Sequence, residues 1–296
     1  MAETQNSLSL NGKQIKFSTS CIGKGSYGQV FAGMYAGRRV AVKKQTHEGC
    51  AKEVMLREIY ILKALANELH HVHFLGCVVN VDGVYIVMEQ LRMTVRDAID
   101  GNHVFDRRLA VMQLLSGMHA LHRRCLMHRD LTPSNVMLTD DNIVRIVDYG
   151  LASYTGRRCY TRQMVTLPYR PPEVLVGSAV YTEKIDVWSA GVIVYELATD
   201  ALPFNVTSEL QLQEAFLREW NVSSSSALLR VSESSPRLCN EVHGWFYRLL
   251  LKHMLLPTAH FRFSAHRLLQ KVSLECAGMK RDRHEPIEES IARRET

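Results

Sequence analysis

Residues 128–150 read HRDLTPSNVMLTDDNIVRIVDYG, and this stretch decides which fold and which chemistry we expect of the chain. It places Asp130 after a His-Arg pair, Asn135 five positions later, and Asp148 before a Tyr-Gly pair. Two apolar segments, VML and IVRIV, lie between these residues and predict a hairpin that holds them over one site. Carboxylate and amide oxygens are ligands for hard cations such as Mg²⁺, which usually share them with substrate phosphates. Asp-Gly-type turns and loop histidines are common, but they do not explain five polar residues in register.

The composition is that of an ordinary globular protein, with 296 residues, 46% hydrophobic and 22% charged. This length allows one large domain or two lobes. The net charge of +6 is mild and the basic residues are spread out, so no direct contact with nucleic acid is expected. Seven scattered cysteines without CxxC spacing argue against disulfides and zinc, and indicate a reducing compartment. With no bilayer-length apolar run and no secretory signal, we expect an intracellular protein of the cytoplasm or nucleus, without a membrane partner.

Three β-type segments, residues 15–23, 29–35 and 38–44, predict a meander whose first turn is the glycine-rich GKGSYGQV. Glycines allow the backbone to approach a phosphate closely. The GxGxxG pattern also occurs in dinucleotide-binding folds, but those require a helix directly after the glycines. Here β-type residues follow, and then Lys43 in VAVK, so a dinucleotide fold is disfavoured.

The next segment, residues 52–69, has helical periodicity that places Glu58 within its apolar stripe. A carboxylate on a buried face is costly unless it is paired, and Lys43 is the evident partner. Further along, we expect a hairpin across the Asp82-Gly83 turn and helical structure from about residue 94 to 122. A helix that is apolar on every side, hence buried, is expected to open at Asp186.

These motifs, in this order, closely resemble those of eukaryotic protein kinases over residues 15–271. The resemblance implies an α+β bilobal protein-kinase fold: a small β-rich N-lobe with one main helix, and a larger, mostly α-helical C-lobe. The expected organisation is a flexible extension (1–14), the N-lobe (15–91), the C-lobe (92–272) and a charged flexible tail (273–296).

The resemblance also implies roles for individual residues. Lys43 with Glu58 would fix the phosphates of ATP, and Asp148 with Asn135 would hold Mg²⁺. Asp130 would orient the substrate hydroxyl and accept its proton. Met88 would guard the back of the nucleotide pocket, and the backbone after it would bind adenine. The residues assigned to nucleotide binding are Ile22, Gly23, Lys24, Gly25, Ser26, Tyr27, Gly28, Val30, Ala41, Lys43, Met88, Glu89, Leu91 and Met137.

Residues 151–173 lack periodicity and resemble an activation segment. Thr161 matches the activating phosphothreonine of cyclin-dependent kinases; the alternative is an exposed, unmodified threonine. Arg57 and Arg129 match two arginines that would clamp its phosphate. Thr166 matches the threonine that serine/threonine kinases place beside the catalytic aspartate.

The resemblance is greatest to the cyclin-dependent and MAP kinase (CMGC) group, in which an arginine at the position of Arg170 favours proline after the target residue. A late Arg262 would pair with Glu173. The implied function is an ATP-dependent serine/threonine protein kinase, activated by phosphorylation of Thr161. Its partners would be protein substrates and, as activator, a cyclin-like protein or an upstream kinase.

Two departures stand inside the motifs. Thr132 replaces a lysine that contacts the transferring phosphate, and losing such a charge can cost on the order of 10²-fold in rate. The alternative function is therefore a catalytically weak pseudokinase or an ATP-binding scaffold, unless Lys44 or an arginine of the activation segment compensates. Tyr149 replaces phenylalanine, and its hydroxyl then needs a partner.

Overall fold

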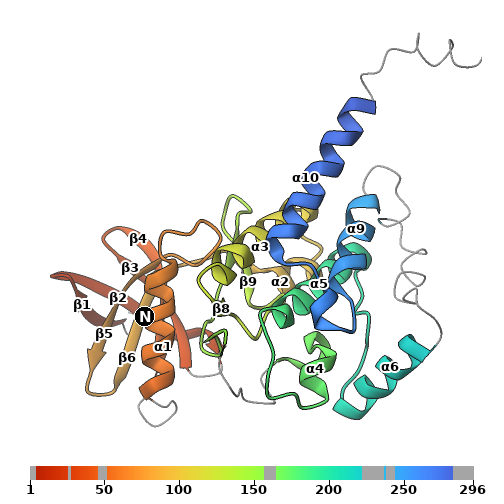
Figure 1. Cartoon of the computed structure of the whole chain (residues 1–296). Coiled ribbons are helices and arrows are strands. Elements are labelled where there is room, and N and C mark those ends of the chain that lie inside the picture. The colour runs from red at the N-terminus through yellow and green to blue at the C-terminus, as the bar shows by residue number, and fades with distance from the viewer. Residues whose placement is uncertain are drawn as a thin grey trace, which may run out of the picture.

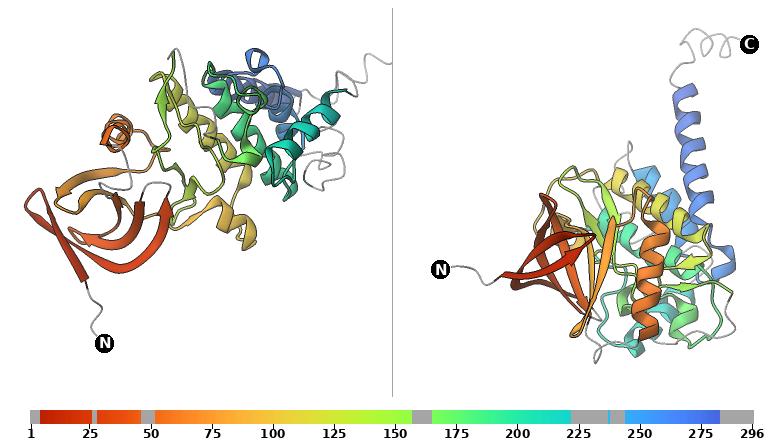
Figure 2. Two further views of the ribbon diagram at one scale, coloured as in Figure 1. Left: turned by 90° about the horizontal axis from the view of Figure 1, so that it is seen from below. Right: turned by 90° about the vertical axis from the view of Figure 1, so that its left-hand side faces the viewer.

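The computed structural model describes residues 5–25, 28–45, 52–156, 165–221, 237 and 244–282. A β-sheet with one long helix lies at one end of the molecule, and a helical lobe forms the rest (Figure 1). The left view of Figure 2 shows the same separation from below. The expected bilobal α+β architecture is therefore present.

The N-lobe is a six-stranded antiparallel sheet in the order β1-β2-β3-β4-β6-β5, accompanied by helix α1. The buried face of α1 carries Met55, Ile59, Ile61, Leu62 and Leu65 at helical spacing, together with Glu58. The predicted meander and the hairpin across Asp82-Gly83 are both formed. The elements are β1 (Gln5–Leu10), β2 (Lys13–Gly25), β3 (Gly28–Tyr35), β4 (Arg38–Gln45), α1 (Lys52–Leu65), β5 (Phe74–Asn80) and β6 (Gly83–Glu89).

Strand β1 corrects the expectation of a flexible extension over residues 1–14. It pairs antiparallel with β2, from Gln5 opposite Ser18 to Leu10 opposite Lys13. Leu10 is only 7% exposed and packs over Gly76, where an added Cβ would lie 2.8 Å from Leu10 Cδ1. The strand forms because residues 7–10 alternate Ser and Leu. The leucines lie on one side of the strand and pack in a hydrophobic cluster of the N-lobe sheet that includes Ile15 and Phe17.

The C-lobe is organised around α5 (Lys184–Thr199), in which every residue from Ile185 to Ala198 is buried, as predicted. The helical region expected from residue 94 to 122 is divided, because Thr94 and Asp106 each cap a separate helix. None of the described helices is long and apolar enough to cross a membrane. The remaining helices and turns are α2 (Val95–Asp100), α3 (Arg107–His122), η1 (Leu167–Tyr169), α4 (Pro172–Leu175), α6 (Glu209–Asn221), α9 (Gly244–Met254), η3 (Ala259–Phe261) and α10 (Ala265–Asp282).

Helix α10 corrects the expectation of a flexible tail from residue 273, because the helix continues to Asp282. Leu268 and Val272 are buried and Cys276 is half-buried, so one stripe of the helix packs on the C-lobe. The helix is the blue element that projects from the lobe in Figure 1. Residues 283–296 of the predicted tail lie outside the described part of the chain.

Short strands at the junction of the lobes flank the loops that hold Asp130, Asn135 and Asp148. They are β7 (Met93–Thr94), β8 (Leu126–Met127), β9 (Val136–Leu138), β10 (Val144–Ile146) and β11 (Ser153–Tyr154). The hairpin expected within residues 128–150 is β9 paired with β10.

The predicted pair between Arg262 and Glu173 is formed and closes the lower part of the C-lobe. The guanidinium nitrogens lie 2.7 and 2.8 Å from the two carboxylate oxygens. Arg262 also donates to the carbonyls of Leu256, Pro257 and Lys184, which satisfies a fully buried side chain.

We expect Gly76→Ala to lower the free energy of unfolding by about 1–3 kcal/mol, because its Cβ would overlap the Leu10 side chain. Urea denaturation monitored by far-UV circular dichroism measures this change. Leu10→Ala, which opens that space, should make the double variant less destabilised than the sum of the single variants. Strict additivity would show that β1 does not pack on Gly76.

Candidate active site

A cavity of about 350 Å³ lies between the sheet and the helical lobe, and most of the predicted nucleotide-binding residues line it. Gly25 and Gly28 face each other at the ends of β2 and β3 and do not line it. A Cβ on Gly28 would lie 2.2 Å from the Lys44 carbonyl oxygen, so only glycine fits this approach of two strands. Ser26 and Tyr27 lie outside the described residues. The predicted residues that line the cavity are Ile22, Gly23, Lys24, Val30, Ala41, Lys43, Met88, Glu89, Leu91 and Met137.

Lys43 is the centre of the charged end of this cavity. Its Nζ lies 2.7 Å from Glu58 Oε1, which forms the predicted pair, and 2.8 Å from Asp148 Oδ1. Burial alone would lower the pKa of Lys43, but the charges of Glu58 and Asp148 outweigh it and raise this pKa. Burial would likewise raise the pKa of Asp148, yet the Lys43 ammonium lowers it, so the carboxylate stays ionised.

The sequence analysis missed Gln45, whose side chain completes this cluster. Gln45 Nε2 donates to Glu58 Oε2 at 2.5 Å, so both oxygens of the buried carboxylate are satisfied. Gln45 lies two residues after Lys43 on β4, and side chains two apart share one face of a strand. That spacing was the available signal.

Asp130 and Asn135 face each other within residues 128–135, the predicted catalytic loop. Asn135 Nδ2 donates to the carbonyl oxygen of Asp130 at 2.8 Å and to its carboxylate at 3.1 Å. Thr166 donates to the same carboxylate through its hydroxyl at 2.6 Å and its backbone N–H at 3.2 Å. Thr166 is thus placed beside Asp130, as the sequence predicted.

The donor set suits a hard divalent cation. Because the amide nitrogen of Asn135 is engaged by Asp130, its Oδ1 is left as an acceptor. Together with the ionised Asp148 carboxylate, it offers the oxygen ligands that Mg²⁺ takes, with phosphate and water supplying the remainder. Asn135 and Asp148 both line the cavity.

Asp186, a buried residue that the sequence analysis did not assign to the site, fixes the backbone of the catalytic loop. Asp186 accepts from the backbone N–H groups of His128 at 2.8 Å and Arg129 at 2.9 Å, and from His122 Nε2 at 2.9 Å. Burial would raise the pKa of Asp186, but the hydrogen bond from His122 keeps it below its usual value. Arg129 has φ of +72°, a left-handed conformation that this anchoring supports.

The Tyr149 hydroxyl has a buried hydrogen-bond partner, which the sequence analysis expected but could not name. Its Oη lies 2.5 Å from Nδ1 of His71, in the connection between α1 and β5, and 3.1 Å from the Ile146 carbonyl oxygen. His71 and Tyr149 are 2% and 0% exposed. No local pattern marks His71 as this partner, because 78 residues separate the two.

The carboxylate of Glu89 is engaged by two hydrogen bonds within the protein. Its Oε1 accepts from the His73 backbone N–H at 2.8 Å and from Arg145 Nε at 3.0 Å. A role for Glu89 in nucleotide binding therefore falls to its backbone. Gln90, which belongs to the run after Met88 whose backbone is expected to bind adenine, also lines the cavity. The sequence analysis missed other residues that line it: Leu62, Val72, Thr94, Ser134 and Val147.

The predicted phosphate clamp is described only in part. Arg57 donates to the Gly150 carbonyl at 3.0 Å. This hydrogen bond links α1 to residues 148–150, the predicted metal-binding loop, which we call the metal loop. The guanidinium carbon of Arg129 lies 5.7 Å from the centre of the Tyr181 ring. Thr161 lies outside the described residues, as do Arg157, Arg158 and Arg162, so the clamp stays a prediction.

Thr132 and Lys44 bear on the missing catalytic lysine. Thr132 is buried, and its hydroxyl accepts the Asn135 backbone N–H at 3.3 Å, so it supports the loop. Lys44 Nζ pairs with Asp82 at 2.6 Å, at the far end of β6, and does not face the cavity. The suggestion that Lys44 compensates is therefore wrong, because adjacent residues on a strand point to opposite faces.

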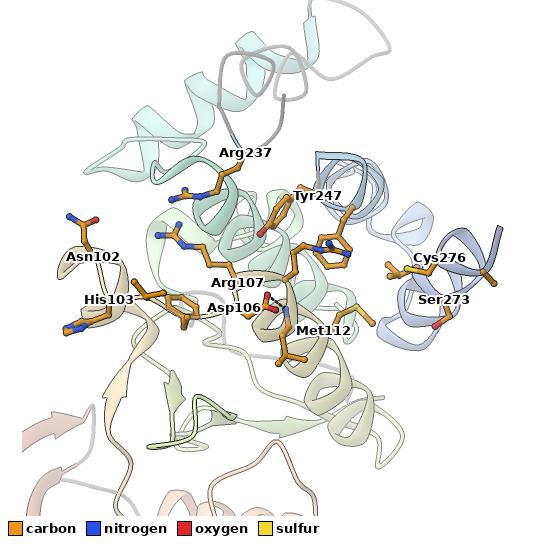
Figure 3. Close-up of a pocket in the computed structure, with 16 residues that line it drawn as sticks. Asn102, His103, Asp106, Arg107, Met112, Arg237, Tyr247, Ser273 and Cys276 are labelled. Atoms are coloured by element: carbon orange, nitrogen blue, oxygen red, sulfur yellow. Dashed lines mark hydrogen bonds between the residues drawn. The ribbon is translucent and has the colours of Figure 1, made fainter. Parts of the chain in front are cut away.

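A larger cavity, of about 1130 Å³, lies among α3, α9 and α10 (Figure 3). None of the described residues that line it belongs to the predicted catalytic or nucleotide-binding set. Arg107 and Arg237, which line it, both pair with Asp200 at 2.5 Å. Size alone therefore does not identify the active site, whereas the convergence of charged groups does.

Comparison with known proteins agrees with this geometry. The protein kinase domain family matches residues 18–273. The chain is 37% identical over 211 residues to "Cell division control protein 2 homolog 3" of Trypanosoma brucei brucei. That match covers 66% of this chain and 66% of the relative, slightly less than two thirds of each.

Acid should destabilise the fold through His71. Burial lowers the pKa of His71 from its ordinary value of 6.5 to about 3. The unfolded chain therefore takes up a proton below about pH 6.5 that the folded chain refuses until about pH 3, so stability falls as the pH falls through this window. The slope attributable to His71 is at most about 1.4 kcal/mol per pH unit.

We expect His71→Leu to flatten the dependence of unfolding free energy on pH by about one proton between about pH 6 and 4.5. Urea denaturation at several pH values measures this slope. His260→Leu, at an exposed histidine, is the matched control. Equal slopes in wild type and His71→Leu would contradict the assignment of a neutral, buried imidazole.

Proposed function

The chain belongs to the protein kinase domain family, and we propose that it is an active serine/threonine protein kinase that transfers the γ-phosphoryl group of ATP to protein hydroxyls. One observation carries the proposal: Lys43, Asp148 and Asn135 line one cavity, and Asn135 bonds to Asp130 at its edge. A scaffold would have no need to retain this complete set. ATP and Mg²⁺ are the cofactors that the set fits.

In the proposed reaction the protein contributes position and charge more than covalent chemistry. Lys43, fixed by Glu58, would neutralise the nucleotide phosphates, and Asn135 with Asp148 would hold Mg²⁺, which offsets the charge that develops on the transferring group. Asp130 would orient the incoming hydroxyl and receive its proton. Thr166 donates two hydrogen bonds to the Asp130 carboxylate, which fixes the direction of its remaining oxygen.

The choice of serine and threonine over tyrosine rests on Thr166, and a preference for proline after the target rests on Arg170. Arg170 Nε donates to the Val165 carbonyl at 2.9 Å, and its guanidinium also pairs with Glu209 on α6. These contacts hold the segment that would receive the substrate peptide. Phosphorylation of Thr161, held by Arg57 and Arg129, is the proposed activating step, with an upstream kinase or a cyclin-like protein as activator.

A second candidate, an ATP-binding scaffold with weak transfer, is favoured by Thr132 alone. In place of a mobile cation beside the transferring phosphate stands a buried hydroxyl that caps the loop. Because Lys43, Asn135 and Asp148 line one cavity, we expect both candidates to bind Mg-ATP and to differ in the rate of transfer.

Asp130→Asn should reduce phosphoryl transfer by about 10²–10⁴-fold, because the proton acceptor is lost. Transfer from radiolabelled ATP to a generic protein substrate measures the rate, and a rise in melting temperature with Mg-ATP measures binding, which should persist. Asp141→Asn, at an exposed aspartate in the turn between β9 and β10, is the control. Absence of transfer in wild type and variant, with Mg-ATP binding retained in both, would leave the scaffold.

Thr132→Lys should raise the transfer rate, on the order of tenfold, by restoring a cation near the transferring phosphate. Thr132→Met, with a long uncharged side chain, separates the effect of charge from that of lost capping. The rates are compared at saturating ATP. An increase in both variants, or in neither, would show that charge at this position does not limit the reaction.

A further inference from the structure

A buried chain of hydrogen bonds runs from helix α3 to the loop that carries Asp148. His71 Nε2 lies 3.0 Å from the Gly117 carbonyl oxygen, and His71 Nδ1 lies 2.5 Å from Tyr149 Oη. The chain joins three segments that are distant in sequence: α3, the α1–β5 connection and the metal loop.

The direction of each hydrogen bond follows from the groups present. A carbonyl oxygen only accepts, so Nε2 of His71 carries the hydrogen that it donates to Gly117. Burial keeps the imidazole neutral, and its Nδ1 is then an acceptor. Tyr149 has a single hydroxyl proton, which it donates to Nδ1 of His71.

His71 itself is held firmly. Backbone hydrogen bonds join Val72 N–H to the Ile146 carbonyl at 3.1 Å and Ile146 N–H to the His70 carbonyl at 2.9 Å. Helix α3 approaches this point closely because residue 117 is glycine: an added Cβ would lie 2.8 Å from Ile146 Cδ1 and 3.1 Å from His70 Cβ. The acceptor offered to Tyr149 therefore has a fixed position.

Tyr149 transmits this position to the neighbouring Asp148. Asp148 has φ of +60°, a left-handed conformation that a non-glycine residue adopts only when its surroundings require it. The Tyr149 ring is fully buried, and its edge packs against His128 with ring centres 5.3 Å apart. Packing alone would hold the Tyr149 ring only by its shape. The hydrogen bond from its hydroxyl to His71 also fixes the orientation of the ring.

We propose that His71 is a positioning residue for the metal site: by accepting a hydrogen bond from the Tyr149 hydroxyl, it holds the Asp148 carboxylate toward Lys43 and Asn135. The proposal rests on the proposed function, in which that carboxylate binds Mg²⁺. It gives a chain-specific reason for tyrosine where the family has phenylalanine. It also means that Tyr149→Phe, although it restores the family residue, impairs the site by leaving a buried acceptor unpaired.

Two single variants at position 71 form the matched pair. In His71→Asn an amide oxygen lies near the position of Nδ1 and can accept from Tyr149, whereas His71→Leu offers no acceptor. In His71→Leu the Tyr149 hydroxyl can still donate to the Ile146 carbonyl, which is 3.1 Å away, so the protein is expected to fold. His71→Leu combined with Tyr149→Phe removes both polar partners, and Tyr195→Phe, at another buried tyrosine, controls for loss of a hydroxyl.

The first readout is the factor by which Mg²⁺ strengthens binding of ADP, measured by calorimetry in Mg²⁺ and in EDTA. Tyr149→Phe should reduce this factor by about tenfold and leave affinity in EDTA unchanged. His71→Leu and the double variant should also reduce it, because neither keeps the Tyr149–His71 hydrogen bond, whereas His71→Asn should stay within about threefold of wild type. Equal losses with and without Mg²⁺, or no difference between His71→Asn and His71→Leu, would overturn the proposal.

The second readout, hydrogen exchange of residues 146–152 without nucleotide, does not depend on catalysis. Exchange should be about tenfold faster in Tyr149→Phe than in wild type, and also faster than wild type in the double variant, which lacks the same hydrogen bond. Unchanged exchange in Tyr149→Phe would overturn the proposal. A wild type that neither binds Mg-ADP nor transfers phosphate would refute the proposed function, while exchange would still decide whether His71 holds the loop.

Discussion

The ammonium group of Lys43 is shared by one carboxylate from each lobe, and the arrangement of the active site depends on this sharing. Glu58 comes from α1 in the N-lobe and Asp148 from the loop after β10 in the C-lobe, and both lie within 2.8 Å of the same nitrogen. Removing one partner from a buried ion pair costs about 3–5 kcal/mol, because the other charge stays desolvated. The position of α1 and the conformation of the metal loop are therefore coupled. Arg57 adds to this coupling through the Gly150 carbonyl.

The C-lobe fixes the positions of the loops that carry these charged groups. Asp186, on the fully buried helix α5, fixes two consecutive backbone N–H groups of the catalytic loop. His128 then accepts the Asp130 N–H at Nδ1, and its Nε2 lies 2.9 Å from the Val147 carbonyl oxygen, next to Asp148. A short path of hydrogen bonds thus connects the buried helix to the loops that carry Asp130 and Asp148. Arg129 and Asp148, which both have a left-handed backbone conformation, lie at the two ends of this path. The hydrogen bonds of the path help to hold these strained conformations.

The chemistry-bearing residues could be predicted because their roles require fixed residue types at short spacings. The Lys43–Glu58 pair followed from the cost of a carboxylate within an apolar stripe, and buried α5 followed from its uniform hydrophobicity. The partner of Tyr149 could not be predicted, because a hydrogen bond across 78 residues leaves no local pattern. Strand β1 was missed because four alternating residues in a polar stretch are a weak signal until a partner strand is known. The end of α10 was missed because charge dominates its sequence, although Leu268, Val272 and Cys276 follow helical spacing.

Strand β1 has a consequence for how the protein behaves in solution. It pairs with residues 13–18 of β2, which would otherwise present an open row of backbone donors and acceptors on the outer side of that strand. Such edges are templates for pairing with strands of other molecules, and they promote aggregation. The first strand thus leaves a strand of six residues at this end of the sheet, so removal of the residues before Lys13 would lengthen the exposed edge of β2 and lower solubility without altering the cavity between the lobes.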